Sequence, residues 1–165
     1  MRIIVIEDNE LYKNELLQCL EQEESDIEIV GSASNGAEGL ALTEKLIRDN
    51  LTPDVIFTDV RMPEVDGFEM IEALQRRGIS CKIVVTSSCP EFLYAKRAME
   101  LGAVDFLVKP LKVYEVRNVL GRLRRELESE KKWKHILNLE YIFLNAMAGK
   151  IKDDQQIGDL IKEGY

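Results

Sequence analysis

The sequence predicts an α/β fold: a doubly wound, five-stranded parallel sheet, (βα)5, with a C-terminal helical extension. Three observations predict it. Short β-branched runs alternate with longer amphipathic stretches, the strand-like runs are almost uninterruptedly apolar, and charged or hydroxyl residues follow four of them. Alternation of strand and helix produces right-handed βαβ crossovers, and uninterrupted apolar strands are typical of a parallel sheet that helices cover on both faces.

Each predicted strand is a short run rich in isoleucine, valine or phenylalanine. The five runs are residues 2–6, 27–33, 54–59, 82–87 and 104–108. Amphipathic stretches between them predict helices at residues 9–24, 36–48, 68–77 and 90–101, and a last helix from residue 112. Ser34 or Asn35 is suited to cap the second helix, and Gly78 to end the third. The apolar face of the first helix is expected to contain Leu11, Leu16, Leu17 and Leu20.

The chain is expected to have two parts, a domain over residues 1–125 and a helical extension over residues 126–165. Apolar residues of the last helix recur at spacings of 3, 4, 3 and 4, which is the repeat of a helix seam. They are Val113, Val116, Leu120, Leu123 and Leu127. The seam is interrupted by residues 128–134 and partly resumes with Trp133, Ile136, Leu137, Leu139 and Phe143. It indicates either packing of this helix on the sheet or a homodimer through the C-terminal helices.

A short final helix is predicted after Gly149, with Asp153 or Asp154 as its cap. Its apolar residues are Ile157, Leu160 and Ile161.

Charge is distributed unevenly along the 165 residues, whose net charge is −8. Residues 1–116 contain 12 Lys and Arg against 22 Asp and Glu, and residues 117–165 contain 10 against 8. The acidic N-terminal part argues against unaided binding of nucleic acid, which requires a basic surface. No signal peptide or apolar run of about 20 residues is present. The three cysteines lack C-x-x-C spacing, so we expect reduced thiols and a cytoplasmic location without a membrane.

Charged residues follow three of the predicted strands, and a hydroxyl ends a fourth. Glu7 and Asp8 come after the first strand, Asp59 ends the third and Lys109 follows the fifth. The carboxyl ends of parallel strands share one edge, where such sheets bind ligands. Mg²⁺ takes carboxylate oxygens and retains waters. We expect Asp8 and Asp59 to bind it, Glu7 to hold a bound water, and the backbone carbonyl of Arg61 to add a ligand.

Phosphoryl chemistry follows from the same residues. A metal beside Asp59 lets phosphate approach this carboxylate, which can act as a nucleophile and form an aspartyl phosphate. Lys109 is expected to neutralise one phosphate oxygen, and a hydroxyl at the end of the fourth strand to donate to another. Thr86, Ser87 and Ser88 compete for that role.

Four peptides together resemble the receiver domain of two-component response regulators, over roughly residues 1–125. They are Val5–Asn9 (VIEDN), Pro53–Pro63 (PDVIFTDVRMP), Asp66–Gly67 and Gly102–Pro110 (GAVDFLVKP). Taken in this order and spacing, they are highly specific. The resemblance implies a flavodoxin-like version of the predicted sheet.

The resemblance also implies roles for individual residues. Asp59 would accept a phosphoryl group from a sensor histidine kinase, with Glu7 and Asp8 as the acidic pair that binds Mg²⁺ or Mn²⁺. Lys109 matches the family's lysine. The peptide bond between Lys109 and Pro110 matches a peptide bond that is often cis in the family. Phe106 matches the aromatic that changes rotamer on activation. Ser87 is the preferred switch hydroxyl because of its spacing to Lys109 and to Phe92, and Thr86 is the alternative.

As implied by the resemblance, the domain signals rather than acts as an enzyme, although it hydrolyses its own phosphoaspartate slowly. Phosphorylation would remodel the face formed by the fourth helix, fifth strand and last helix, which is a second possible homodimer surface. Residues 91–98 (EFLYAKRA) are similar to regulators with a DNA-binding part of the arabinose-regulator type. We therefore expect DNA binding only through an output domain outside this chain. The alternative is a stand-alone adaptor that contacts a protein partner through its helical tail.

Two rival functions fit the sequence less well. Phosphohydrolases of the haloacid-dehalogenase type use a second aspartate two residues after the nucleophile, where this chain has Arg61. A flavodoxin-type mononucleotide binder needs a hydroxyl- or glycine-rich phosphate loop after the first strand. The residues there are Glu7, Asp8, Asn9 and Glu10, which repel phosphate unless a metal intervenes.

Overall fold

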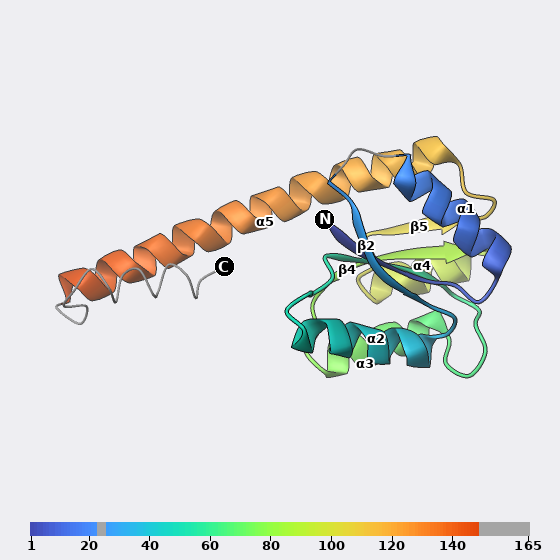
Figure 1. Ribbon diagram of the computed structural model, residues 1–165, viewed down its shortest axis with the longest axis horizontal. Coiled ribbons are helices and arrows are strands. Elements are labelled where there is room, and N and C mark those ends of the chain that lie inside the picture. Colours follow the sequence, from blue (N-terminus) through green and yellow to red (C-terminus); the bar gives the residue numbers. More distant parts are fainter. Residues whose placement is uncertain (23–25, 149–165) are drawn as a thin grey trace. The chain divides into compact units, whose positions relative to one another are not determined.

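The computed structural model describes residues 1–22 and 26–148, and it has the predicted fold, a parallel sheet of order β2-β1-β3-β4-β5 (Figure 1). The strands are β1 (Arg2–Ile6), β2 (Glu28–Ala33), β3 (Val55–Asp59), β4 (Lys82–Ser87) and β5 (Asp105–Val108). The helices are α1 (Glu10–Glu21), α2 (Gly36–Arg48), α3 (Gly67–Arg76), α4 (Phe92–Glu100) and α5 (Val113–Met147). Strand order reverses at β1, so β1 and β3 form the switch point at which such sheets bind ligands.

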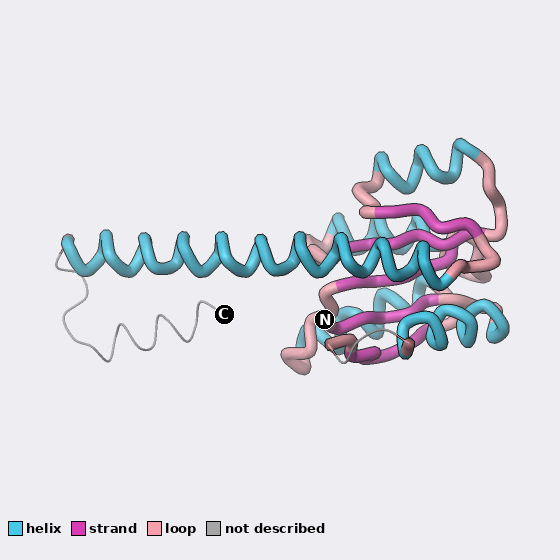
Figure 2. Tube along the Cα trace, turned by 90° about the horizontal axis from the view of Figure 1, so that it is seen from above, coloured by secondary structure: helices cyan, strands magenta, loops and turns pink. Residues whose placement is uncertain are grey.

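The central strands are buried on both faces, which explains their uninterrupted apolar sequences. β3 is buried at every position, and β1 at every position after Arg2. Alternate side chains point to opposite faces. Ile4, Ile6 and Ile56 belong to a core cluster with residues of α2, α3 and α4. Figures 1 and 2 show α1 and the first turns of α5 on the other face.

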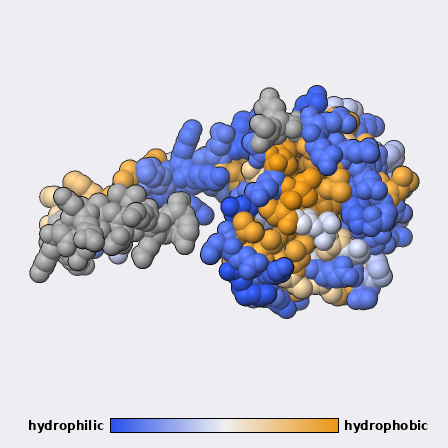
Figure 3. Space-filling view, viewed as in Figure 1, coloured by the Kyte–Doolittle hydropathy of each residue, from blue (hydrophilic) through white to orange (hydrophobic). Residues whose placement is uncertain are grey.

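Edge strand β2 differs from the central strands because most of its residues are exposed or half-buried. On the side of the molecule shown in Figure 3, hydrophobic surface gathers over β2, between the hydrophilic surfaces of α1 and α2. The apolar residues of an edge strand therefore remain partly accessible, as expected of a strand with one neighbour.

Side-chain caps begin three helices next to the strand ends. Asn9 caps α1, Asn35 caps α2, and Asp66 forms a capping box with Glu69 on α3. Asn35, rather than Ser34, is thus the cap of the second helix. Each cap satisfies backbone N–H groups that the first helical turn leaves without partners. The caps fix where each chain segment turns from the sheet edge into a helix.

The prediction for the apolar face of α1 was wrong at Leu11, which is 74% exposed, whereas Leu16 and Leu20 are buried and Leu17 is half-buried. Leu16 lies five positions after Leu11, a rotation of roughly 140° on a helix with 3.6 residues per turn. The third buried residue of this helix is Cys19. The helix ends at Glu21, and part of its predicted C-terminus lies outside the described residues.

Contacts divide the chain into two compact units, Met1–Gly121 and Arg122–Tyr165. Helix α5 contributes residues to both units. Of its predicted seam, Val116, Leu120 and Leu123 are buried, and Val113 and Leu127 are half-buried. The residues with which the seam was expected to resume are exposed; they are Trp133, Ile136, Leu137, Leu139 and Phe143. The helix predicted after Gly149 lies outside the described residues.

Within residues 1–22 and 26–148, no helix combines the length and hydropathy needed to cross a bilayer.

Candidate functional site

The carboxyl ends of β1 and β3 bring three carboxylates together. Ile6 pairs with Thr58 in register, so the next residues, Glu7 and Asp59, lie side by side on the same face of the sheet. Carboxylate oxygens of Glu7, Asp8 and Asp59 lie within 4.8 Å of one another. Glu7 and Asp59 are buried, whereas Asp8 is exposed. The predicted acidic cluster is therefore present, with one member open to solvent.

Lys109 completes this cluster from the end of β5. Its ammonium Nζ lies 2.5 Å from Glu7 Oε2 and 3.1 Å from Asp59 Oδ2, and its side chain is 1% exposed. Nζ also lies 4.5 Å from the ring centroid of Tyr12, in the first turn of α1. The peptide bond between Lys109 and Pro110 is cis. Three different elements thus hold one buried ammonium at the sheet edge.

Asp59 is fixed by the backbone of the loop that follows it. The Val60 N–H donates to Asp59 Oδ1 at 2.7 Å, and the Thr58 hydroxyl donates to the Asp59 carbonyl at 3.0 Å. An added Cβ at Gly67 would lie 2.0 Å from that same carbonyl oxygen. No side chain fits between these two segments, so glycine at residue 67 permits the close approach of α3 to the end of β3.

Burial raises the pKa of both buried carboxyl groups, Glu7 and Asp59, above their ordinary values. The Lys109 ammonium opposes the rise in each case. Neighbouring carboxylates add to it, since Asp59 raises the pKa of Glu7 and Asp8 raises that of Asp59. Three carboxylates against one ammonium favour a further cation, and carboxylate oxygens are the donors that Mg²⁺ and Mn²⁺ accept. The residues present fit such a metal.

The two candidate switch hydroxyls point to opposite faces of the sheet. Thr86 pairs in register with Asp59 and therefore shares its face, and its hydroxyl donates to the Thr58 carbonyl at 3.4 Å. Val85 pairs with Phe106, so Ser87 lies on the same face as Phe106. The Ser87 oxygen accepts a hydrogen bond from the Cys89 N–H at 3.1 Å, which leaves its own proton available.

Phe106 is half-buried and packs against the core cluster beneath α2, α3 and α4. Arg61 is exposed, and its guanidinium donates to the Tyr94 hydroxyl at 3.1 Å. The role of its backbone carbonyl stays a prediction. Sequence reasoning missed Tyr12 and Tyr94. A signal existed for Tyr12, because the first turn of a helix that follows β1 lies close to the strand end; Tyr94 had none.

Comparison with known proteins identifies the family to which this chain belongs. Residues 3–120 match the family model described as response regulator receiver domain. This chain belongs to the response regulator receiver family. Receiver domains are signalling domains that histidine kinases phosphorylate, and they mostly work with output domains.

Two relatives show how varied the output of receiver proteins is. The chain is 36% identical over 126 residues to the transcriptional regulatory protein BtsR of Escherichia coli K12, covering 76% of this chain and 49% of the relative. It is 35% identical over 144 residues to a protein-glutamate methylesterase/protein-glutamine glutaminase of Methanospirillum hungatei. This match covers 86% of this chain and 39% of the relative. This receiver chain spans about half the length of the first of these relatives.

Among solved structures, the response regulatory domain of protein mrkE from Klebsiella pneumoniae has a TM-score of 0.67 and 30% sequence identity. The match covers 78% of this chain and 99% of that domain. The receiver fold therefore accounts for the part of the chain that contains the acidic cluster.

Proposed function

We propose that this receiver accepts a phosphoryl group on Asp59 from a sensor histidine kinase, in a reaction that depends on Mg²⁺ or Mn²⁺. The observation that carries the proposal is the Asp59 carboxylate, held between the Val60 N–H and the Lys109 ammonium at the switch point of the sheet. Glu7 is also buried beside Lys109 in the same acidic cluster, and the resemblance to receivers supports Asp59 as the acceptor and Glu7 as part of the metal site.

In the proposed step an Asp59 carboxylate oxygen attacks phosphorus. The new O–P bond forms as the N–P bond of the kinase phosphohistidine breaks, and the histidine nitrogen keeps the electron pair. Asp8 and Asp59 would bind the metal directly, Glu7 would hold a bound water, and the Arg61 carbonyl would add a ligand. Bound metal would neutralise the incoming phosphate. The Lys109 ammonium would leave its contact with Asp59 Oδ2 and bind a phosphoryl oxygen instead.

The proposed switch follows from the new charge at Asp59. Ser87 would donate its hydroxyl proton to a phosphoryl oxygen, and Phe106 would follow inward. Ser87 shares a face of the sheet with Phe106, which supports Ser87 as the hydroxyl that couples to Phe106. Thr86 shares the face of Asp59 and stays the alternative. The surface of α4, β5 and α5 would change as a result and transmit the signal.

For the output, we propose a receiver over residues 1–125 and a helical extension over residues 126–165 that leads to a DNA-binding domain. Relatives named as transcriptional regulators support this output. The chain itself would act as a signalling domain, with slow loss of its own phosphate as its only catalysis. A homodimer, through the C-terminal helices or through the surface of α4, β5 and α5, belongs to the same proposal. The cytoplasmic location stays a prediction.

A stand-alone adaptor that acts through its helical tail is the alternative output. The exposed apolar residues of α5, Trp133 and Phe143 among them, support it because they offer a surface to a protein partner. A reading frame that continues beyond Tyr165 and encodes a helix-turn-helix would reject the proposal of a stand-alone adaptor.

The proposed chemistry is tested by intact mass after incubation with acetyl phosphate, with and without Mg²⁺. We expect one phosphate adduct in the presence of Mg²⁺ and none in Asp59→Asn. The control is Asp49→Asn, at the exposed C-cap residue of α2, in which the adduct should be unchanged. An undiminished adduct in Asp59→Asn would reject Asp59 as the acceptor.

A further inference from the structure

Helix α4 is weakly anchored to the rest of the receiver. Of its nine residues, all within the described part of the chain, Ala98 alone is buried. Its N-cap, Glu91, makes no capping side-chain hydrogen bond, and the first two helical residues, Phe92 and Leu93, are 78% and 71% exposed. A helix with so little buried apolar surface opens at low cost in free energy.

Two stacked aromatic rings, with a guanidinium over each, form part of the attachment of α4. Tyr94 of α4 stacks on Phe68 of α3, with ring centroids 6.1 Å apart and an interplanar angle of 16°. The guanidinium of Arg97, one turn further along α4, lies 4.9 Å from the Phe68 centroid and donates to Glu72 at 3.2 Å. Both aromatic contacts therefore tie α4 to α3.

Arg61 forms the outer end of this stack and comes from the loop that follows the phosphoacceptor. It is two residues beyond Asp59, and the intervening Val60 N–H donates to the Asp59 carboxylate. Its guanidinium carbon lies 5.3 Å from the Tyr94 ring centroid, and Nη2 donates to the Tyr94 hydroxyl at 3.1 Å. Nη2 also lies 3.8 Å from the Cys89 sulfur. The partners that it contacts directly are thus neutral groups.

A phosphoryl group on Asp59 would compete for this guanidinium. Phosphate on a carboxylate brings additional negative charge and strong acceptor oxygens. The planar guanidinium matches two such oxygens at once, and charge-assisted hydrogen bonds are about twice as strong as neutral ones. Exchange of Tyr94 and Cys89 for phosphoryl oxygens is therefore favourable for Arg61.

We propose that Arg61 binds the phosphoryl group on Asp59 and, in doing so, leaves Tyr94 and releases the N-terminal half of α4. This inference rests on the proposed function, since it requires a phosphoryl group at Asp59. It adds a second link from the acceptor to α4, independent of Ser87 and Phe106. In the unphosphorylated chain Arg61 restrains α4, and in the phosphorylated chain that restraint is absent.

Hydrogen–deuterium exchange of residues 92–97 tests the inference on the whole chain, without and with acetyl phosphate and Mg²⁺. Removal of the guanidinium by Arg61→Ala is expected to speed exchange there roughly five- to tenfold without phosphate, because a cation–π contact and a hydrogen bond are lost. Phosphorylation is expected to speed exchange by a similar factor in the wild type. In Arg61→Ala phosphorylation should speed exchange by a smaller factor than in the wild type, because only the link through Ser87 and Phe106 remains.

Control variants separate the contact from general effects. Tyr94→Phe retains the ring but loses the hydroxyl that accepts from Arg61, and should lie between wild type and Arg61→Ala. Arg48→Ala removes an exposed arginine from the end of α2 and should match wild type. Amides of β1 and β3, measured together, report whether each variant is folded. Arg61→Gln, which also removes the cation, replaces Arg61→Ala if that variant loses their protection.

Two results would overturn the inference. One is equal exchange of α4 in wild type and the Arg61 variant without phosphate, and the other is equal acceleration by phosphate in both. The intact mass of the same samples separates this failure from failure of the proposed function. An adduct with unchanged α4 exchange rejects only the role of Arg61, whereas absence of an adduct from wild type rejects both proposals.

Discussion

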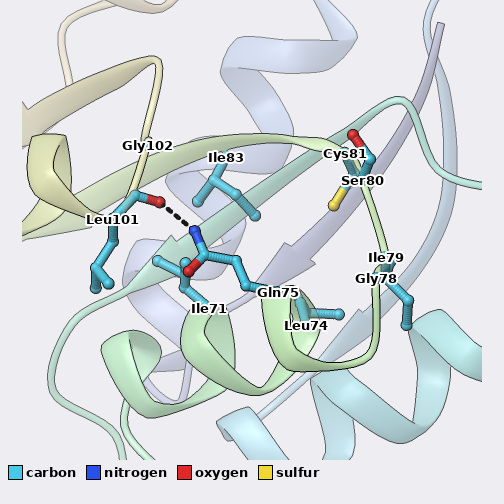
Figure 4. A pocket seen from close by; sticks show the side chains of 10 residues that line it. All are labelled: Ile71, Leu74, Gln75, Gly78, Ile79, Ser80, Cys81, Ile83, Leu101 and Gly102. Atoms are coloured by element: carbon cyan, nitrogen blue, oxygen red, sulfur yellow. Dashed lines mark hydrogen bonds between the residues drawn. The ribbon is translucent and has the colours of Figure 1, made fainter.

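The carboxyl end of the sheet contains two buried carboxylates and a buried ammonium, whereas the opposite end of β4 adjoins a pocket with no charged lining residue. This pocket has a volume of about 340 Å³. Figure 4 shows its lining between the end of α3 and the loop after α4, with Gln75 donating to the Leu101 carbonyl at 2.7 Å across it. Its one thiol is Cys81, whose pKa burial raises to about 11, so it stays protonated at neutral pH.

The contrast between the two ends supports placing the proposed chemistry where the charges lie rather than where the cavity is. The pocket has a volume within the range of small-molecule sites, yet no lining group is set up for acid, base or nucleophilic work. The acidic edge instead places three carboxylates and an ammonium within a few ångströms of one another, as the proposed phosphoryl transfer requires.

The largest expected effect comes from removal of the buried ammonium. Lys109→Ala leaves Glu7 and Asp59 facing each other without a cation, which should lower the free energy of unfolding by about 3 kcal/mol in the absence of Mg²⁺. Urea denaturation measures it, with exposed Lys96→Ala as the control. A loss no larger than in the control would mean that the ammonium does not stabilise the edge.

One glycine lies at each of the two ends, and the two differ in how closely other atoms approach them. Gly67→Ala would place a methyl group 2.0 Å from the Asp59 carbonyl, so we expect a loss of roughly 2–3 kcal/mol and weaker phosphate incorporation. Gly102→Ala, at the pocket, has φ +77° but no close neighbour, and should cost about 1 kcal/mol without affecting the adduct. Thermal unfolding and intact mass give both quantities. Equal effects of the two substitutions would mean that the end of β3 is packed no more tightly than the pocket end of the sheet.

A smaller effect is expected at Tyr12, whose ring faces the Lys109 ammonium at 4.5 Å. Tyr12→Leu should lower the free energy of unfolding by about 1 kcal/mol, whereas Tyr12→Phe, which keeps the aromatic face, should cost less than half as much. Denaturation of both variants in parallel measures the difference. If leucine and phenylalanine behave alike, the ring face does not hold the ammonium.

The smallest effect is a gain in stability in Asp59→Asn without Mg²⁺. The pKa of Asp59 is raised in the folded chain. At pH values above the ordinary carboxyl pKa, near 3.8, ionised Asp59 therefore lowers the free energy of unfolding. This cost disappears as the pH falls below that value. The amide removes the cost, and at pH 7 we expect a gain above the roughly 0.5 kcal/mol typical of surface changes. Denaturation at pH 7 and pH 4 should show the gain only at pH 7. A loss at pH 7 would contradict the sign.

The fold and the acidic edge were predictable from sequence because both depend on local patterns. Short apolar runs fixed the strands, and topology alone brings Glu7, Asp59 and Lys109 to one edge. Contacts between side chains of different helices were not predictable in this way. Leu11 was wrongly assigned to the buried face of α1, because its position on the helix is rotated away from the face that Leu16 and Leu20 occupy. The contact of Tyr94 with Arg61 depends on how α4 packs, which no local spacing encodes.

The central claim is that Asp59, at the charged end of the sheet, receives the phosphoryl group. Borohydride reduction of the chain after treatment with acetyl phosphate and Mg²⁺ converts an aspartyl phosphate to homoserine, which peptide mass spectrometry locates. We predict homoserine at residue 59, dependent on Mg²⁺ and absent without phosphodonor. Homoserine at another carboxylate, Asp8 included, with residue 59 unchanged, would contradict the account.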